Sequence, residues 1–166
     1  MSQEHYWKEF YRLKVHVCYM ELQLGSTEST DRALKIFLAI TSSASIGGWA
    51  IWKDLASVWG AIIAASQVVN STRQYFPYKE RLRALSGLLN DLDELLIQVE
   101  SRWLDISGGL LSEAEIRKAL DDLRVRKLKA FKKYFPDNMI PDNGRLFQKA
   151  EEKALEYFDN FYPAEQ

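Results

Sequence analysis

The spacing of apolar residues along the chain predicts an all-α protein. Residues 3–24 place apolar side chains three or four positions apart, which is the spacing of one helix face. These side chains are Tyr6, Phe10, Leu13, Val17 and Met20. We expect the turn-rich segment 25–30 to end this helix, and Thr30 or Asp31 can cap the helix that follows.

Two stretches without a formal charge come next. Residues 36–52 and 55–72 contain no Asp, Glu, Lys or Arg, and Lys53 and Asp54 separate them. At a rise of about 1.5 Å per residue, each stretch reaches roughly 26 Å as a helix, close to the ~30 Å hydrocarbon core of a bilayer. Aromatic residues gather at both ends of the pair, as they do at membrane interfaces. We therefore expect residues 31–76 to form a transmembrane helical hairpin.

The charges beside this hairpin predict its orientation. Residues 1–35 carry five Lys or Arg side chains and residues 73–83 carry four, whereas the turn carries only Lys53. Because basic residues are enriched on the cytoplasmic side of a membrane, both termini are expected in the cytoplasm.

Small and polar residues within the two stretches predict how hairpins pack together. Small residues four positions apart let helix backbones approach closely. The candidates for this packing are Ser43, Ala44, Gly47, Gly48, Gly60 and Ala64. Polar side chains in hydrocarbon need a partner or water, so Ser66, Gln67 and Asn70 are candidate lining residues of a pore built by several hairpins. The alternative is that they are polar contacts between packed helices.

The segment after Pro77 has a heptad pattern, which is typical of a coiled coil or a bundle helix. Its apolar positions are spaced 3-4-3-4-3-4-3, and Leu88 and Leu95 widen the stripe, which favours a bundle or a higher oligomer. This oligomer or bundle seam consists of Leu82, Leu85, Leu89, Leu92, Leu96, Val99, Trp103 and Ile106.

Two further helices are predicted beyond this seam. Ser112 and Glu115 have the spacing of a capping box, which predicts a helix over about 113–135, and a last helix is expected over about 143–161. The expected organisation is an N-terminal amphipathic helix and turn over 1–30, the transmembrane hairpin over 31–76, and a cytoplasmic helical region of bundle or coiled-coil type over 77–166.

Composition and motifs narrow the classes of function. The net charge of −1 argues against a general nucleic-acid binder, and the single cysteine allows no internal disulfide. The chain contains two histidines and no nucleophile, metal or phosphate-loop motif. We therefore expect no enzyme activity, no catalytic residue, no cofactor and no metal.

One group of basic residues is a candidate binding surface. Residues 117–133 contain eight Lys or Arg side chains. Such a group can attract an anionic ligand or the anionic inner leaflet of a membrane, although a solvated helix face gives the same pattern. The candidate residues are Arg124, Lys127, Lys129 and Lys132.

The layout resembles that of the SLATT superfamily of two-transmembrane bacterial proteins, which associate with SMODS nucleotidyltransferases and SLOG domains. The resemblance consists of the leading helix, the hairpin IFLAITSSASIGGWAIW–KD–LASVWGAIIAASQVVNST and the long helix from Pro77. It implies an effector of the bacterial inner membrane that forms pores in antiviral, abortive-infection type defence. The implied trigger is a nucleotide signal or a partner protein from a neighbouring defence gene. The resemblance transfers no site residue, because it has no catalytic motif.

Two functions of different classes follow. The first is an oligomeric membrane effector whose hairpins contact membrane lipid and other copies of the chain, which the charge-free stretches favour. The alternative is a soluble all-α interaction or accessory protein with residues 36–72 as a buried core hairpin, because the polar residues of these stretches weaken membrane insertion.

Overall fold

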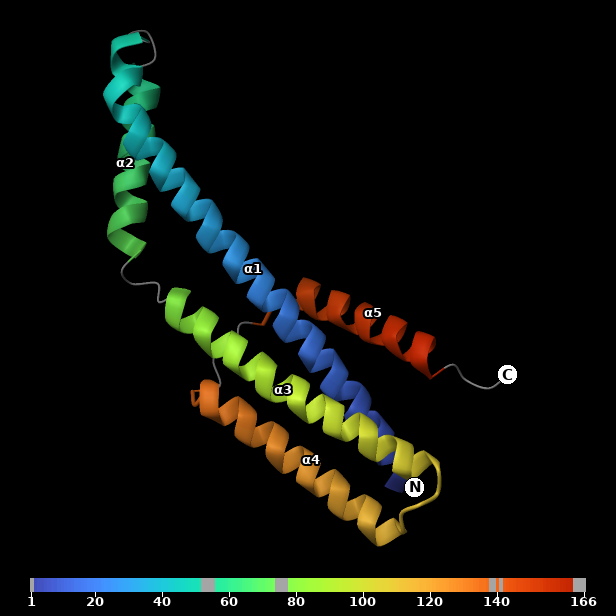
Figure 1. Cartoon of the computed structure of the whole chain (residues 1–166). Coiled ribbons are helices and arrows are strands. Elements are labelled where there is room, and N and C mark those ends of the chain that lie inside the picture. Colours follow the sequence, from blue (N-terminus) through green and yellow to red (C-terminus); the bar gives the residue numbers. More distant parts are fainter. Residues whose placement is uncertain (1, 52–55, 74–77, 138–139, 141, 163–166) are drawn as a thin grey trace. The chain divides into compact units, whose positions relative to one another are not determined.

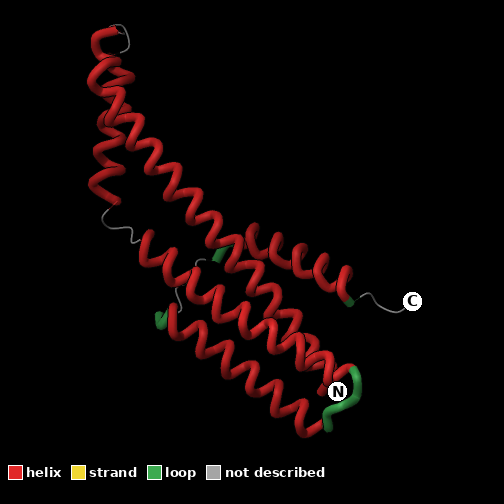
Figure 2. Tube along the Cα trace, viewed as in Figure 1, coloured by secondary structure: helices red, strands yellow, loops and turns green. Residues whose placement is uncertain are grey.

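The computed structural model describes residues 2–51, 56–73, 78–137, 140 and 142–162, without the side chains of 42–51, 56, 59, 72, 73 and 78. The described residues form five α-helices and no strand, which confirms the all-α prediction (Figure 1; Figure 2). The helices are α1 (Ser2–Ile51), α2 (Ala56–Arg73), α3 (Tyr78–Ser107), α4 (Glu113–Tyr134) and α5 (Gly144–Phe161).

Helix α1 runs through segment 25–30 without a break, so the predicted end of the first helix is wrong. Thr30 does not cap a new helix, and its hydroxyl donates a hydrogen bond to the carbonyl of Ser26 at 2.9 Å within α1. Burial of one helix face continues through the segment and overrides the weak helix propensity of Gly, Ser and Thr. The buried polar residues of that face are Gln23, Thr27 and Asp31.

The chain forms two compact units. The first, called here the bundle unit, consists of Met1–Leu24 and Arg83–Gln166, and the second, the hairpin unit, consists of Gly25–Leu82. The N-terminal helix therefore belongs with the C-terminal helices, although the charge-free stretches separate them in sequence. Helix α1 contributes its first half to the bundle unit and its second half to the hairpin unit.

The bundle unit has one apolar core. All five apolar residues predicted for the first helix face are buried there, together with apolar residues of α3, α4 and α5. The ring of Trp7 lies 4.6 Å from that of Trp103 on α3 and 4.9 Å from that of Phe158 on α5. The first half of α1 is thus in contact with both of these helices.

The ends of the helices in the bundle unit follow local capping chemistry. After α3, the N–H groups of Gly109 and Leu110 donate to the carbonyls of Ile106 and Asp105, and Gly109 has a φ of +72°, which together form a Schellman motif. The predicted capping box of α4 is present, because Ser112 and Glu115 bond to each other reciprocally.

Polar side chains also join the helices of the bundle unit. Glu100 of α3 accepts hydrogen bonds from the hydroxyls of Tyr157 and Tyr162 of the C-terminal segment, at 2.5 and 2.8 Å. Burial and the bond to Glu100 raise the pKa of Tyr162 to about 12. Both phenols therefore remain protonated donors at neutral pH, and they hold α5 against α3.

The predicted membrane spans receive no support from the described residues. Within that part of the chain, none of the helices is apolar over a length sufficient to cross a bilayer. Both charge-free stretches include residues outside it, namely Trp52 and Leu55, and so does the predicted turn between them at Lys53 and Asp54. The transmembrane nature of the hairpin remains a prediction.

Candidate functional site

The second half of α1 exposes large apolar side chains and buries polar ones. Ile36 and Ile40 are 53% and 61% exposed, and Phe37 beside them is also exposed. Asp31 and Thr41, in contrast, are buried. A helix pair stable in water alone is expected to show the opposite distribution, with its apolar stripe inside.

Helix α2 repeats this inverted distribution. Val58 and Val68 are exposed, whereas Ser66 is buried and Ile62 and Ile63 are half-buried. Apart from Asn70, the exposed side chains of α2 fall into two stripes at three- and four-residue spacing. One stripe is apolar and comprises Val58, Ala61, Ala65 and Val68. The other is small and polar and comprises Ser57, Gly60, Ala64, Gln67 and Ser71.

Two buried hydroxyl groups of the hairpin unit, those of Thr41 and Ser66, are hydrogen-bonded within their own helices. The Thr41 hydroxyl donates to the carbonyls of Phe37 and Leu38 at 3.0 and 3.1 Å. The Ser66 hydroxyl donates to the carbonyl of Ile63 at 2.8 Å. Because such bonds remove the need for a partner on another helix, these two residues can face an apolar surrounding at little cost.

The predicted pore-lining residues fall on two sides of α2. Gln67 and Asn70 are exposed on the outside of the hairpin unit, and Ser66 is buried. Gly60 and Ala64 are also exposed, and a Cβ atom added to Gly60 would meet no described atom within 4 Å. Close approach at Gly60 therefore requires another molecule. The other predicted packing residues, Ser43, Ala44, Gly47 and Gly48, lie in the part of α1 where the structure describes the backbone alone.

The predicted heptad seam packs within its own chain. Five of its residues are buried and the other three are half-buried. The buried ones are Leu85, Leu92, Leu96, Val99 and Ile106. Apart from Leu82, which belongs to the hairpin unit, the seam contributes to the core of the bundle unit, so an oligomer built on it would require the bundle to open.

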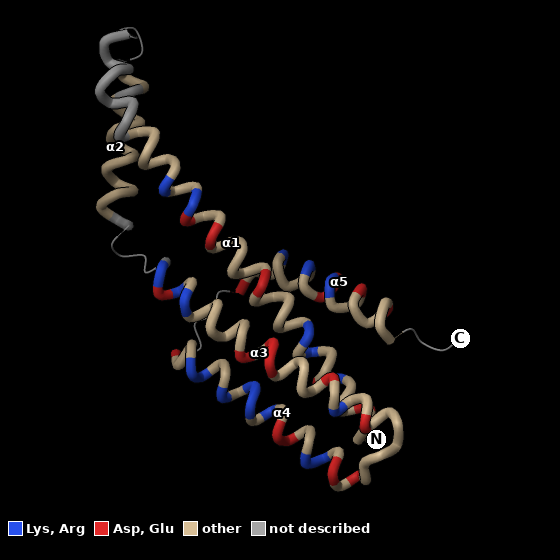
Figure 3. The backbone as a smooth tube through the Cα atoms, viewed as in Figure 1, with Lys and Arg blue, Asp and Glu red and all other residues tan. Residues whose placement is uncertain are grey.

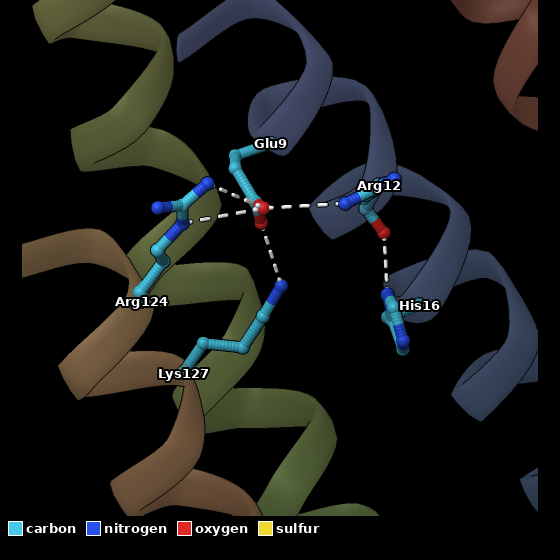
Figure 4. A network of polar contacts seen from close by, with 5 residues as sticks. All are labelled: Glu9, Arg12, His16, Arg124 and Lys127. Carbon is cyan, nitrogen blue, oxygen red and sulfur yellow. Dashed lines mark hydrogen bonds and ion pairs between the residues drawn. The ribbon is translucent and has the colours of Figure 1, made fainter. Parts of the chain in front are cut away.

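Two of the predicted anion-binding residues contact an acidic side chain of α1 (Figure 4). Lys127 Nζ lies 2.9 Å from Glu9 Oε2, and Arg124 approaches Glu9 Oε1 at 3.3 Å through both Nε and Nη2. Arg12 adds a third contact at 3.4 Å. Lys129 and Lys132 are exposed, and among the described residues neither has an ion-pair partner.

The surroundings of Glu9 keep its carboxylate ionised. The Glu9 side chain is only 7% exposed. Burial by itself raises the pKa of Glu9, but the hydrogen bond from Lys127 and the charges of Lys127 and Arg124 outweigh burial and lower the pKa. A buried charge is stable only when it is paired and hydrogen-bonded, and these contacts tie α1 to α4.

His16 lies seven residues, or about two helical turns, after Glu9 on the same face of α1. Its Nδ1 is 2.5 Å from the carbonyl oxygen of Arg12, and its ring meets the edge of Phe131. Burial, together with the nearby charges of Lys127 and Arg12, lowers the pKa of His16 below its ordinary value of 6.5. The imidazole is therefore neutral at pH 7 and donates to the Arg12 carbonyl.

The sequence contains a signal that Glu9 is buried. Tyr6, Leu13 and Met20 alternate with Glu9 and His16 at a spacing of 3-4-3-4 along α1. A charged residue at such a position lies on the buried face and needs partners of opposite charge. Arg12 is close to Glu9 in the sequence, but Arg124 and Lys127 are more than a hundred residues away. The sequence therefore indicated that Glu9 needs partners of opposite charge but not the two that α4 supplies.

The described residues show no constellation that points to catalysis. Among them, no group of three or more His, Cys, Asp or Glu side chains could hold a metal ion. Burial raises the pKa of the Cys18 thiol, which disfavours a reactive thiolate. Asp91 of α3 is paired with Lys133 at 2.9 Å.

Comparison of this chain with protein-family models, with curated proteins and with solved structures finds no match in any of the three. The function must therefore be argued from the residues themselves, and the inverted surface of the hairpin unit is the feature that requires explanation.

Proposed function

We propose that this protein is a membrane effector whose hairpin unit inserts into a lipid bilayer and assembles with other copies into a pore. The observation that carries the proposal is the inverted distribution in the hairpin unit, where Ile36, Ile40 and Val68 are exposed while Thr41 and Ser66 are buried. Lipid provides an apolar surrounding for the outside of such a hairpin, and small or hydroxyl residues are typical of helix contacts inside membranes.

Water is a poor solvent for the exposed apolar surface of the hairpin unit. Complete burial of a fully exposed large aliphatic side chain contributes roughly 1.5–3 kcal/mol, and side chains such as Ile40, which is 61% exposed, gain part of this when they are covered. Several such side chains lie together on one unit, so their combined transfer favours either lipid or another protein surface. The buried hydroxyls do not oppose insertion, because their hydrogen bonds stay within their own helices.

The pore assignment concerns the polar stripe of α2. Gln67 and Asn70 lie on the outside of the hairpin unit. In hydrocarbon these amides need partners or water, and neighbouring copies arranged around an aqueous path supply both. Gly60 and Ala64 lie in the same exposed stripe as Gln67 and would allow those copies to approach closely. Several hairpins would thus form the lining together.

The resemblance to the SLATT superfamily adds a cellular location, a role and a trigger to this proposal. On that basis, the protein acts from the bacterial inner membrane with both termini in the cytoplasm. Loss of ion gradients through the pore would then serve antiviral defence of the abortive-infection type, after a nucleotide signal or a partner protein triggers assembly.

Membrane insertion is tested by placing a charge on the apolar outside of the hairpin unit. Ile40→Lys is expected to move the protein from the carbonate-resistant membrane fraction to the supernatant, because a lysine inside a bilayer costs roughly 3 kcal/mol. Ile97→Lys is the matched control, since Ile97 is 68% exposed on α3 of the bundle unit. Wild-type protein that is folded and monodisperse in a detergent-free supernatant would contradict insertion.

Pore formation is tested separately from insertion. The double variant Gln67→Leu and Asn70→Leu is expected to remain in the membrane and to lose ion conductance across vesicles. A control on the apolar stripe, Val58→Leu with Val68→Leu, is expected to keep the conductance. Unchanged conductance in the Gln67 and Asn70 variant would show that these residues do not line the path.

A second candidate function is a soluble interaction or accessory protein. It is favoured by the finding that no described helix has the length and apolar character needed to cross a bilayer. In that case another protein, or a second copy, covers Ile36, Phe37 and Ile40. The fractionation experiment separates the two candidates, because this one predicts that the protein stays in the supernatant.

A further inference from the structure

The charges of α4 change sign along the helix (Figure 3). Residues 113–122 contain four acidic and two basic side chains, whereas residues 123–134 contain six basic and no acidic ones. The second half of α4 is therefore a concentrated source of positive charge in a chain whose net charge is −1.

Most of these cations already have partners within the chain. Arg124 and Lys127 contact Glu9, Lys133 contacts Asp91, and Arg126 lies 3.7 Å from Asp122. The remaining two are Lys129 and Lys132, which are exposed and have no ion-pair partner among the described residues. Their charges are available to a molecule outside the chain.

The two lysines share a helix face with exposed apolar residues. Val125, Leu128, Lys129 and Lys132 occupy positions i, i+3, i+4 and i+7, which lie on one side of a helix. Val125 is exposed and Leu128 is 53% exposed, while the opposite face of α4 is buried in the core. We name these four residues the α4 outer face.

We infer that the α4 outer face binds the surface of an anionic lipid bilayer. Lysine ammonium groups pair with lipid phosphates, while Val125 and Leu128 enter the boundary between headgroups and acyl chains. Charge complementarity selects this partner, because the face combines two apolar side chains with two cations that have no ion-pair partner in the described part of the chain, and residues 123–134 contain six basic and no acidic residues. Asp91 and Glu94 of α3 line the same hollow as Lys129, and Asp91 is paired with Lys133. The inference rests on the proposed function and adds a second, peripheral membrane contact to the inserted hairpin.

The test measures binding of the full-length protein to two kinds of vesicle. One kind is pure phosphatidylcholine, and the other is a phosphatidylcholine–phosphatidylglycerol mixture. Wild type is expected to bind the anionic vesicles more strongly, and Lys129→Gln with Lys132→Gln to lose that preference, by about fivefold for each lysine. Lys149→Gln with Lys153→Gln is the matched control, because both are exposed on α5 and the charge change is the same.

A further variant, Leu128→Gln, tests the apolar part of the face. It is expected to weaken binding to anionic vesicles while circular dichroism remains that of the wild type, because Leu128 lies outside the core. Equal affinity of the wild type for both vesicles would overturn the inference. So would a lysine double variant that keeps the anionic preference, or a control pair that loses as much of it.

Failure of this inference is distinguishable from failure of the proposed function. Binding to neutral vesicles reports the hairpin, and the ratio of anionic to neutral binding reports the α4 outer face. An Ile40→Lys protein that binds no neutral vesicle and still prefers anionic ones supports the α4 outer face on its own. Wild type that binds neutral vesicles without any anionic preference would leave the hairpin proposal standing and remove this one.

Discussion

At the scale of single residues, Glu9 is a buried negative charge that joins two helices of the bundle unit. Its carboxylate is 7% exposed and faces Lys127, Arg124 and Arg12. Removing one member of a buried pair costs more than the pair contributes, because the remaining charge stays desolvated. Lys127 and Arg124 are themselves partly exposed, which moderates that cost.

The first prediction concerns this carboxylate. Glu9→Gln keeps the size of the side chain but removes its charge, and we expect the free energy of unfolding to fall by about 1–3 kcal/mol. Urea denaturation of the full-length protein measures the change. Glu4→Gln is the control, because the Glu4 and Lys8 pair is exposed and such pairs contribute little. Equal midpoints for wild type and Glu9→Gln would show that the ion pairs are not stabilising.

The second prediction concerns pH. The pKa of His16 is lowered in the folded state, mainly by burial, so the unfolded chain binds a proton more readily. Stability is therefore complete above the ordinary pKa of 6.5 and decreases as the pH falls below it. Glu9 has a lowered pKa too, but its contribution is lost only below its ordinary value of 4.5. Between about pH 7 and pH 5.5, His16 accounts for the decrease.

The variant His16→Leu separates these two windows. It has no group that titrates at this position, so its free energy of unfolding should be flatter than that of the wild type between pH 7 and pH 5.5. Below pH 4.5 both proteins should lose stability together, because both retain Glu9. Parallel stability curves over the upper window would contradict a neutral, buried His16.

At the scale of elements, local chemistry made several helix ends predictable from the sequence. Ser112 and Glu115 begin α4, and Gly109 follows the end of α3, because capping needs only residues that are neighbours in the chain. The apolar faces of the helices were also predictable, because the spacing of apolar residues along one helix is a local property of the sequence. Segment 25–30 was mispredicted, since burial of its Thr27 depends on tertiary packing that local propensity does not include.

The candidate sites were likewise predictable only in part, because tertiary packing decides which of their residues are exposed. The sequence identified Gln67 and Asn70 as polar residues in an apolar stretch, but their exposure, and the burial of Ser66 beside them, depends on which face of α2 turns inward. The basic residues of α4 were identified as a group. Their division into partners of Glu9 and unpaired lysines required the contact between α1 and α4.

The third prediction tests the continuity of α1. Gly25 lies inside the helix, and a Cβ atom there would meet nothing within 4 Å. Gly25→Ala should therefore raise the free energy of unfolding by about 0.5–1 kcal/mol. Gly109→Ala is the contrasting variant and should lower it by about 1–2 kcal/mol, because φ at Gly109 is +72°. A destabilising Gly25→Ala would indicate that the helix does break there.

At the scale of the whole molecule, the two units differ in how they are stabilised. The bundle unit buries a continuous apolar core drawn from four helices, which include the first half of α1. The hairpin unit buries polar residues such as Thr41 and Ser66 and leaves Ile40 and Val68 in contact with water. The bundle unit therefore has its own source of stability, whereas the hairpin unit gains stability when another apolar phase covers it.

The fourth prediction follows from this difference and is measured by amide hydrogen exchange. Without lipid, amides of α3 between Leu85 and Val99 should exchange slowly, and those of residues 36–41 and 58–71 faster, because protection follows buried apolar contacts. Addition of phosphatidylcholine vesicles should slow exchange in the two hairpin segments and leave α3 unchanged. If protection of these segments instead rises with protein concentration and ignores lipid, a second copy covers the apolar surface, and the interaction function replaces the membrane one.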